Sequence, residues 1–206
     1  MNILCRVMRY NSKAHHRRSI RLKQYDYSQI GVYFVTICTY HRDCLFGKII
    51  NGEIILNEIG LLVQNEWVKT EKIRDNILID VYLVMPNHLH GIIMINNVGA
   101  YSHTPLQNVF RSTSKTIGAI IRGFKSTTTK QINQYRQNPY LPVWQRNYYE
   151  HIIRNEDELS HIREYILNNP LQWEYDRENI FRISNKANQW QVLEEIIYGI
   201  GISKKF

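Results

Sequence analysis

Two histidines and, much further along the chain, a tyrosine and an asparagine have the types and spacing needed to act on a phosphodiester. His88 and His90 flank Leu89 in an apolar, β-branched segment. A strand turns successive side chains to opposite faces, so both imidazoles point one way while Leu89 points into a core. Tyr165 and Asn169 are four residues apart, which places them on one face of a helix.

These four groups are sufficient for metal-assisted cleavage of a nucleic-acid strand. A divalent ion held by His88 and His90 would offset the negative charge that builds up on a phosphate under attack. The amide oxygen of Asn169 could add a third ligand, and mixed nitrogen and oxygen ligands suit Mn²⁺, or Mg²⁺ where waters complete the shell. Zinc more often brings three strong protein ligands. Tyr165 would attack the phosphorus and form a covalent phosphotyrosine link, so the strand could be rejoined without ATP.

Each of these residues also has a purely structural interpretation. A His-x-His pair arises by chance in many strands, and a tyrosine on an amphipathic helix usually packs in the core. Asn169 precedes Pro170 and could simply end its helix. Tyr148 and Tyr149 are rival nucleophiles, although core packing or base stacking is the better explanation for an adjacent pair in a strand.

The hydrophobic pattern predicts an α+β fold with a central, mostly antiparallel sheet. An Asn-Gly pair at 51–52 between apolar runs predicts a hairpin, and Asn155, followed by three acidic residues, predicts a helix start. The expected strands cover 31–40, 78–85, 88–95 and 143–153, the hairpin 48–56, and the helices 57–73, 114–136 and 155–169. The expected organisation is a basic arm at 1–28, one domain at 29–180 and an appendage at 181–206.

The net charge of +8 in 206 residues favours a polyanionic partner, nucleic acid first. The basic residues gather in two places rather than spreading evenly, although a solvated basic surface would explain the second group equally well. We expect phosphate contacts from Arg17, Arg18, Arg21 and Lys23 in the arm and from Arg122, Lys125 and Lys130 on the predicted helix. Tyr135, Tyr140 or Trp144 could stack on unpaired bases.

The remaining composition limits where this chemistry takes place. The three cysteines are sparse and have no CxxC spacing, which is typical of neither a disulfide framework nor a zinc cluster and fits a reducing cytoplasm. The N-terminus has no long apolar run before its basic residues, as a secretory signal would. The apolar runs are too short to span a bilayer, so we expect no membrane partner.

Three segments of the chain resemble the signatures of a known family. Met85–Gly91 (MPNHLHG) resembles the His-hydrophobic-His motif of the HUH endonucleases. Val143–Arg154 (VWQRNYYEHIIR), followed by Arg163–Ile166 (REYI) and Asn168–Pro170 (NNP), is similar to the C-terminal signature of the REP-associated tyrosine transposases, in the single-tyrosine, IS200-like superfamily. Arg17–Lys23 and Tyr25–Tyr27 resemble their N-terminal entry, so the resemblance runs from about residue 17 to 180.

This resemblance implies a ferredoxin-like core and one catalytic tyrosine per chain. It implies cleavage of single-stranded DNA at or near a hairpin, leaving a 5′-phosphotyrosine and a free 3′-hydroxyl. By position, His88 and His90 match the metal pair, Tyr165 the nucleophile and Asn169 the amide that completes the metal site. The partner would be single-stranded or hairpin DNA, and the protein a monomer or a homodimer. The chain after residue 180 has no counterpart in these signatures.

Two other functions remain compatible with the sequence. A hairpin-binding repressor or architectural protein could keep the same fold without catalysis, although all the expected catalytic residues are present. An HUH replication initiator or relaxase is the other alternative, but those proteins often carry extra tyrosines and added helicase domains, for which this chain is too short.

Overall fold

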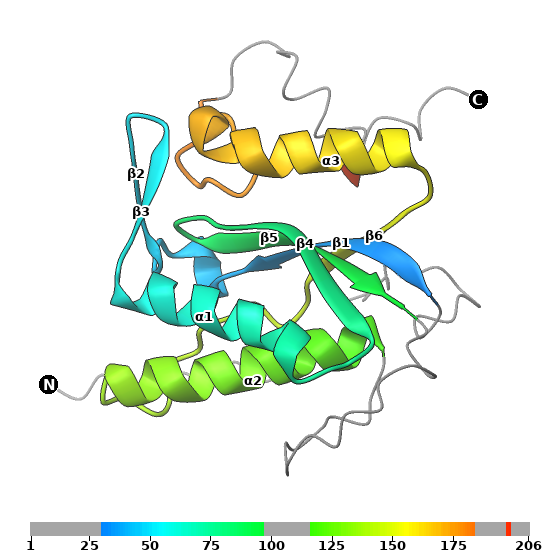
Figure 1. Cartoon of the computed structure of the whole chain (residues 1–206). Helices are drawn as coiled ribbons and strands as arrows, with labels where there is room; N and C mark the ends of the chain where they lie inside the picture. Colours follow the sequence, from blue (N-terminus) through cyan, green and yellow to red (C-terminus); the bar gives the residue numbers. More distant parts are fainter. Residues whose placement is uncertain (1–29, 97–115, 184–196, 199–206) are drawn as a thin grey trace, which may run out of the picture.

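The computed structural model describes residues 30–96, 116–183 and 197–198. Its centre is an antiparallel sheet of four strands in the order β4-β5-β1-β6 (Figure 1). The strands are β1 (Gly31–Cys38), β4 (Ile77–Val84), β5 (His88–Ile95) and β6 (Tyr149–Ile153), and a separate hairpin is formed by β2 (Gly47–Ile50) and β3 (Glu53–Leu56). The predicted arm at 1–28 lies outside the described residues, as does most of 181–206.

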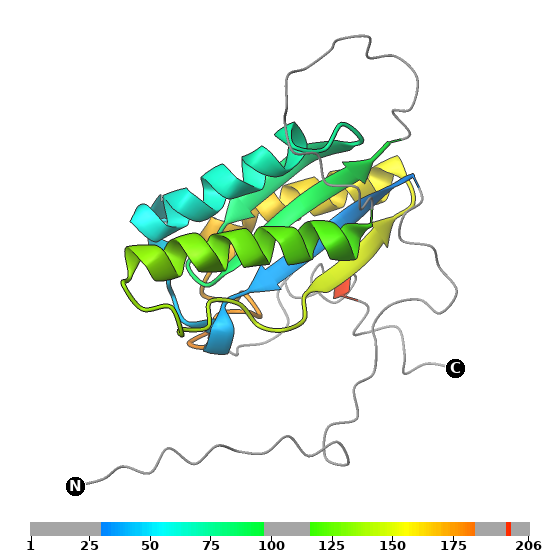
Figure 2. The same cartoon turned by 90° about the horizontal axis from the view of Figure 1, so that it is seen from below.

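Three helices cover the two faces of this sheet. α1 (Glu58–Lys72) and α2 (Ile117–Tyr135) lie on one face and α3 (Glu156–Asn168) on the other (Figures 1 and 2). Two short 3₁₀ segments, η1 (Tyr40–Arg42) and η2 (Asn169–Gln172), follow β1 and α3. With the β2–β3 hairpin set aside, the order β1-α1-β4-β5-α2-β6 and the strand order are those of a ferredoxin-like fold, which confirms the predicted fold class.

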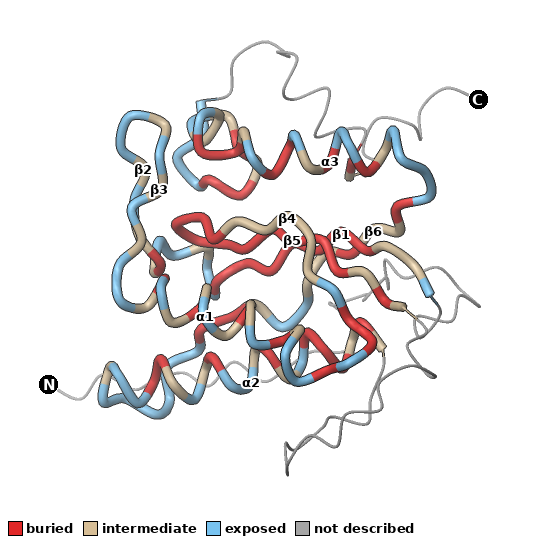
Figure 3. The backbone as a smooth tube through the Cα atoms, viewed as in Figure 1, coloured by how far each residue is buried: buried red, intermediate tan, exposed pale blue. Residues whose placement is uncertain are grey.

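The alternation of side chains along β5 separates two apolar cores. Leu89 and Ile93 point toward α1 and α2, where Trp67 packs edge-on against Phe124 with ring centroids 5.1 Å apart. Ile92 belongs to the second core, under α3. Between the two cores, most residues of β5 and of β1 are buried (Figure 3).

Local sequence signals place most element boundaries. Asn51 and Gly52 both have positive φ, 52° and 77°, as the tight turn of the β2–β3 hairpin requires. Asn155 caps α3 as predicted and Asn57 caps α1, since their side chains accept hydrogen bonds from the backbone N–H groups of Glu158 and Gly60. These caps fix where the helices begin.

The strand predicted over 143–153 is half wrong, because only Tyr149–Ile153 forms β6. The preceding residues contact β1 and α2 without a regular ladder. A single β-bridge joins Trp144 to Thr39, and the ammonium of Lys125 donates hydrogen bonds to the backbone carbonyls of Gln145 and Asn147. Those carbonyls are therefore bound to a side chain rather than to a neighbouring strand.

Gly91 on β5 is required by the packing of α1, because a Cβ atom there would lie 2.5 Å from Cζ2 of the buried Trp67. We expect Gly91→Ala to destabilise the fold by about 1–3 kcal/mol through overpacking, with the melting temperature falling by about 2–4 °C per kcal/mol. Gly123→Ala in α2 is the control, since its Cβ would meet only the guanidinium end of Arg74 at 3.3 Å and alanine favours a helix. Equal melting temperatures for the two variants would contradict this view of the α1 face.

Candidate functional site

His88 and His90 lie side by side on the face of the sheet that α3 covers. Both are fully buried, and their Nε2 atoms are 3.0 Å apart. They stand opposite Cys38 and Thr36 of β1 in the antiparallel register. The prediction that both imidazoles share a face while Leu89 enters the other core is confirmed.

The far nitrogen of each imidazole is held by a buried polar side chain. Nδ1 of His88 lies 2.8 Å from Oδ1 of Asn87, and the amide nitrogen of Asn87 donates to the carbonyls of Arg42 and Glu178. That arrangement makes Asn87 Oδ1 an acceptor, so His88 carries its proton on Nδ1 and its Nε2 lone pair faces Nε2 of His90. Nδ1 of His90 lies 2.9 Å from the hydroxyl of Thr36, which can donate or accept. Such outer hydrogen bonds fix the orientation of metal-binding imidazoles.

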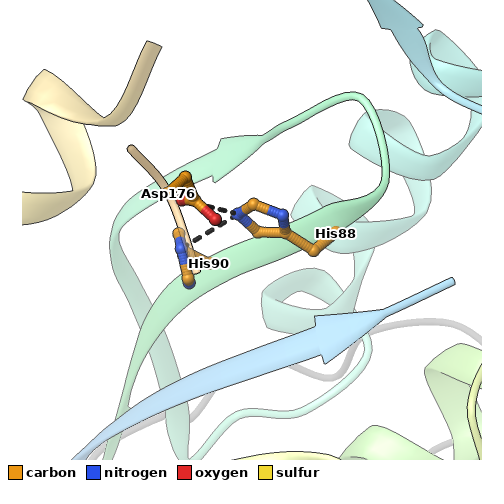
Figure 4. A group of neighbouring side chains, drawn as sticks. All are labelled: His88, His90 and Asp176. Atoms are coloured by element: carbon orange, nitrogen blue, oxygen red, sulfur yellow. Dashed lines mark hydrogen bonds and ion pairs between the residues drawn. The ribbon is translucent and has the colours of Figure 1, made fainter. Parts of the chain in front are cut away.

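A carboxylate completes a cluster with the two histidines (Figure 4). Oδ2 of the fully buried Asp176 is 3.9 Å from Nε2 of His88 and has no hydrogen-bond partner among the described residues. Its other oxygen accepts from the backbone N–H of Glu178 at 2.6 Å. Ligand atoms of His88, His90 and Asp176 all lie within 4.8 Å of one another, so this group could hold a metal ion.

Burial also sets the protonation of the two imidazoles. Desolvation is the main cause that lowers the pKa of His88, although the nearby carboxylates of Asp176 and Glu178 act in the opposite direction. The pKa of His90 falls well below its usual value, through desolvation first and then through the charges of His88 and Arg177. Both rings are therefore neutral near pH 7, which is the form that binds metals.

Tyr165 projects from α3 toward this cluster. Its ring is fully buried, with its centroid 5.3 Å from that of His90 and 6.1 Å from that of Phe34. Its side chain hydrogen-bonds Tyr198, whose pKa is raised well above the usual value chiefly by burial and whose hydroxyl also lies 2.9 Å from that of Thr36. A phosphodiester can reach Tyr165 only if some of these rings move.

Asn169 lies at the junction of α3 and η2. It is fully buried, and neither polar atom of its amide has a hydrogen-bond partner among the described residues. A buried amide without partners costs about 1–3 kcal/mol, so its retention needs a reason. Its role as a metal ligand stays a prediction.

Sequence reasoning missed the residues that surround the histidines. Thr36 and Asp176 carry no local signature, because only strand pairing and the turn at η2 bring them to the site. Asn87 offered the one available signal, since an amide directly before a His-x-His pair can reach the ring of the first histidine. Asp176 and Glu178 are acidic, but acidic residues in a polar stretch are usually solvated.

The predicted DNA-binding residues differ in their exposure and in whether the structure describes them. Arg122 and Lys130 are exposed on α2, on the sheet face opposite the histidines, and the basic residues of the arm (Arg17, Arg18, Arg21 and Lys23) lie outside the described residues. The ammonium of Lys125 donates to two backbone carbonyls, at 2.9 and 2.8 Å, and burial lowers its pKa to about 8, so it is still charged at pH 7.

The aromatic candidates also separate. Tyr135 and Tyr140 are exposed, the latter by 91%, whereas Trp144, the third candidate for stacking, is only 8% exposed and is part of the core. Its indole is buried and donates to the hydroxyl of Thr128 at 2.9 Å. The rival nucleophiles are both engaged as donors, Tyr148 to the carboxylate of Glu150 and Tyr149 to the carbonyl of Ile197.

The fold and the buried cluster define a class of protein: a ferredoxin-like α+β domain with a histidine pair and a carboxylate able to hold a metal ion beneath an added helix. Among the described helices, none is long and apolar enough to cross a membrane. No family model matches the chain. A Haemophilus influenzae protein, described as uncharacterized, is 46% identical over 175 residues, which cover 82% of this chain and 96% of that protein. The chain belongs to the same family as that protein.

Solved structures extend the comparison to the fold. A REP-associated tyrosine transposase bound to a REP hairpin is similar over 77% of each chain, with 19% identity and a TM-score of 0.52. A Deinococcus radiodurans protein covers 72% of this chain and 95% of its own, with 16% identity and a TM-score of 0.40, too low to support an argument. The resemblance noted in the sequence is thus confirmed at the level of the fold.

The two lysines of α2 provide a test of structural against DNA-binding roles. We expect Lys125→Met to destabilise the fold by about 1–3 kcal/mol, because two carbonyls lose a charged donor. Lys130→Met, at an exposed position of the same helix, should change stability by less than about 0.5 kcal/mol. Urea denaturation measures the free energy of unfolding of both variants. Equal stabilities would show that Lys125 has no structural role and remains a candidate for binding phosphate.

Proposed function

We propose that this protein is a metal-dependent tyrosine transposase that cuts and rejoins single-stranded DNA at hairpins. The observation that carries the proposal is the position of Tyr165, whose ring centroid lies 5.3 Å from that of His90 within one chain. Metal ligands and a nucleophile are separate requirements of this chemistry, and the fold brings candidates for both to one buried place. The similarity of fold to a transposase bound to a REP hairpin supports the same class of substrate.

The donor set fits a divalent metal. Two nitrogens that each lie about 2.1 Å from one ion at a right angle are about 3.0 Å apart, and the Nε2 atoms of His88 and His90 have that separation. A hydrogen bond between the two rings would also give this distance, so the stronger support is the unpartnered Oδ2 of Asp176, a buried anionic atom that needs a positive partner. A bound ion would supply Lewis acidity toward a phosphate oxygen.

Different residues of the chain have different roles in the proposed reaction. His88 and His90 hold the ion through nitrogen, while Asn87 and Thr36 fix the rings. Tyr165 provides the phenol oxygen that bonds to phosphorus as the bond to the 3′ oxygen breaks, which leaves a 5′-phosphotyrosine and a 3′-hydroxyl. The covalent link conserves the energy of the broken bond, so a second strand end can reverse the reaction.

The third protein ligand is Asp176 in our proposal, with the sequence-predicted Asn169 as an additional oxygen donor. A carboxylate brings charge that an amide lacks, and two imidazoles with one carboxylate form a set that suits Mn²⁺ and other transition ions. The basic arm, together with Arg122 and Lys130, would contribute phosphate contacts that make binding depend on salt.

A non-catalytic hairpin-binding protein is the second candidate function. The complete burial of Tyr165 favours it, because a nucleophile covered by aromatic rings is inactive until they move. Formation of a covalent adduct separates the two candidates.

Tyr165→Phe tests the nucleophile. We expect Mn²⁺-dependent adducts with hairpin DNA from the flanks of the gene to fall by at least about 10³-fold, while hairpin binding persists. Denaturing gels with 5′- and 3′-labelled strands show the adduct and identify which DNA fragment, 5′ or 3′ of the break, is bound to the protein. Tyr148→Phe and Tyr149→Phe, which each lose one hydroxyl, should retain it. If Tyr165→Phe forms adduct at the wild-type rate, the nucleophile is misassigned, and no adduct with the wild-type protein would favour the binding function.

Asp176→Asn tests the third ligand without relying on activity. We expect Mn²⁺ affinity to fall by at least about tenfold, because a charged oxygen ligand becomes a neutral amide. Isothermal titration calorimetry measures the Mn²⁺ affinity, and the electron paramagnetic resonance spectrum of bound Mn²⁺ reports a change in its ligands. Asn169→Ala should have the smaller effect. The reverse order would make the amide the third ligand, and unchanged affinity in His88→Asn would argue against the whole site.

A further inference from the structure

An open pocket of about 400 Å³ at the end of β1 is a feature that the proposed reaction does not use. Its walls are η1 and the segment that runs from α2 toward β6. Five side chains line it: Tyr40, His41, Arg42, Gln145 and Arg146. Ligand pockets begin at about 300 Å³, so this one has room for a small organic group.

The walls combine aromatic and cationic groups. Tyr40 is 41% exposed, and its ring centroid lies 3.9 Å from that of the exposed His41. Arg146 is exposed and forms no ion pair with any residue in the described ranges. None of the five lining residues is acidic. An exposed ring beside an uncompensated guanidinium can bind a base by stacking and a phosphate by charge.

The pocket is held in shape by the polar network of the candidate metal site. The guanidinium of Arg42 donates to Glu178 through Nε at 2.7 Å, and the carbonyl of Arg42 accepts from Asn87. Asn87 in turn holds the ring of His88. His41 and Arg42 both have positive φ, 56° and 58°, a conformation that costs each residue about 1 kcal/mol or more and persists only where the surroundings impose it.

Both walls are also tied to the sheet near His88. The backbone N–H of Tyr40 donates to Val143, and that of Gln145 donates to Cys38, the residue that faces His88 in the β1–β5 register. A group bound in the pocket would therefore lie just beyond the end of β1 that pairs with His88.

We propose that this pocket binds one unpaired nucleotide of the DNA strand next to the phosphodiester that is cut. Its base stacks on Tyr40, and its phosphate pairs with Arg146. This inference rests on the proposed function, because it takes the histidine cluster as the point of cleavage. Arg42 acts as a positioning residue that joins the pocket to Asn87 and so to His88.

The binding experiment uses the full chain in EDTA, so that no strand is cut. Fluorescence anisotropy compares a DNA hairpin that carries a short single-stranded flank with the same hairpin without it. We expect Tyr40→Leu to weaken binding of the flanked hairpin by about 5- to 100-fold, the usual effect of losing one stacked base, and to change the bare hairpin by less than about twofold. Tyr40→Phe should restore the flanked affinity, because stacking needs the ring and not the hydroxyl.

Arg146→Gln should weaken the flanked hairpin and lower the salt dependence of its binding. Arg154→Gln is the matched control, since Arg154 is exposed at the opposite end of β6 and also loses one charge. A fluorescent aminopurine, placed in turn at each flank position, should be quenched by the wild-type protein at one position and not by Tyr40→Leu. An RNA flank that binds as tightly as DNA with the same quenching would replace the proposed strand with RNA.

The pocket's role would be overturned if Tyr40→Leu lost affinity equally for the flanked and the bare hairpin. Aminopurine quenching that persists in Tyr40→Leu would overturn it as well. That failure is separable from failure of the proposed function. Adducts with Mn²⁺ and unchanged flank binding would remove only the pocket, whereas flank-specific binding without any adduct would keep the pocket and remove the catalysis.

Discussion

The antiparallel pairing of β5 with β1 is the constraint on which the rest of the structure depends. It sets His88 opposite Cys38 and His90 opposite Thr36. A slip of one residue would turn the imidazoles into the apolar core under α1 and α2 and turn Leu89 toward α3. The core would lose the contacts of Leu89, and both imidazoles would be buried without hydrogen-bond partners. The apolar side of β5 therefore fixes the register, and the register fixes the polar site.

The other face of the same strand explains why the site can be so fully enclosed. Trp67 packs over Gly91 and against Phe124, so α1 and α2 close one face mainly through apolar contacts. That leaves α3 free to cover the second face with a mixed surface, in which Tyr165 and Asn169 lie among Ile162 and Ile166. Buried polar atoms without partners occur on both faces of the sheet, but those that lie with the histidine cluster, above all Oδ2 of Asp176, are on the face that α3 covers.

Sequence patterns predicted what depends on neighbours along the chain. Alternation along β5 and the asparagine caps are local, and both are confirmed in the structure. What could not be predicted depends on the tertiary path. Asp176 reaches His88 only because η2 turns the chain back over the sheet, and the carbonyls that bind Lys125 lie on a segment whose β-rich composition predicted a strand. In both cases a side-chain interaction over a long sequence distance overrides local preference.

The unpartnered polar atoms connect stability with chemistry. Asp176 and Asn169 both hold buried oxygens that no described residue satisfies, and each such atom costs about 1–3 kcal/mol. A sequence selected only for stability would replace them with apolar residues of similar size, as buried ionic groups often can be. A ligand that binds only the folded state offsets this cost by mass action. The energetic penalty and the capacity to bind a cation are thus two aspects of one arrangement, in which the fold holds electron-rich atoms together that would otherwise separate.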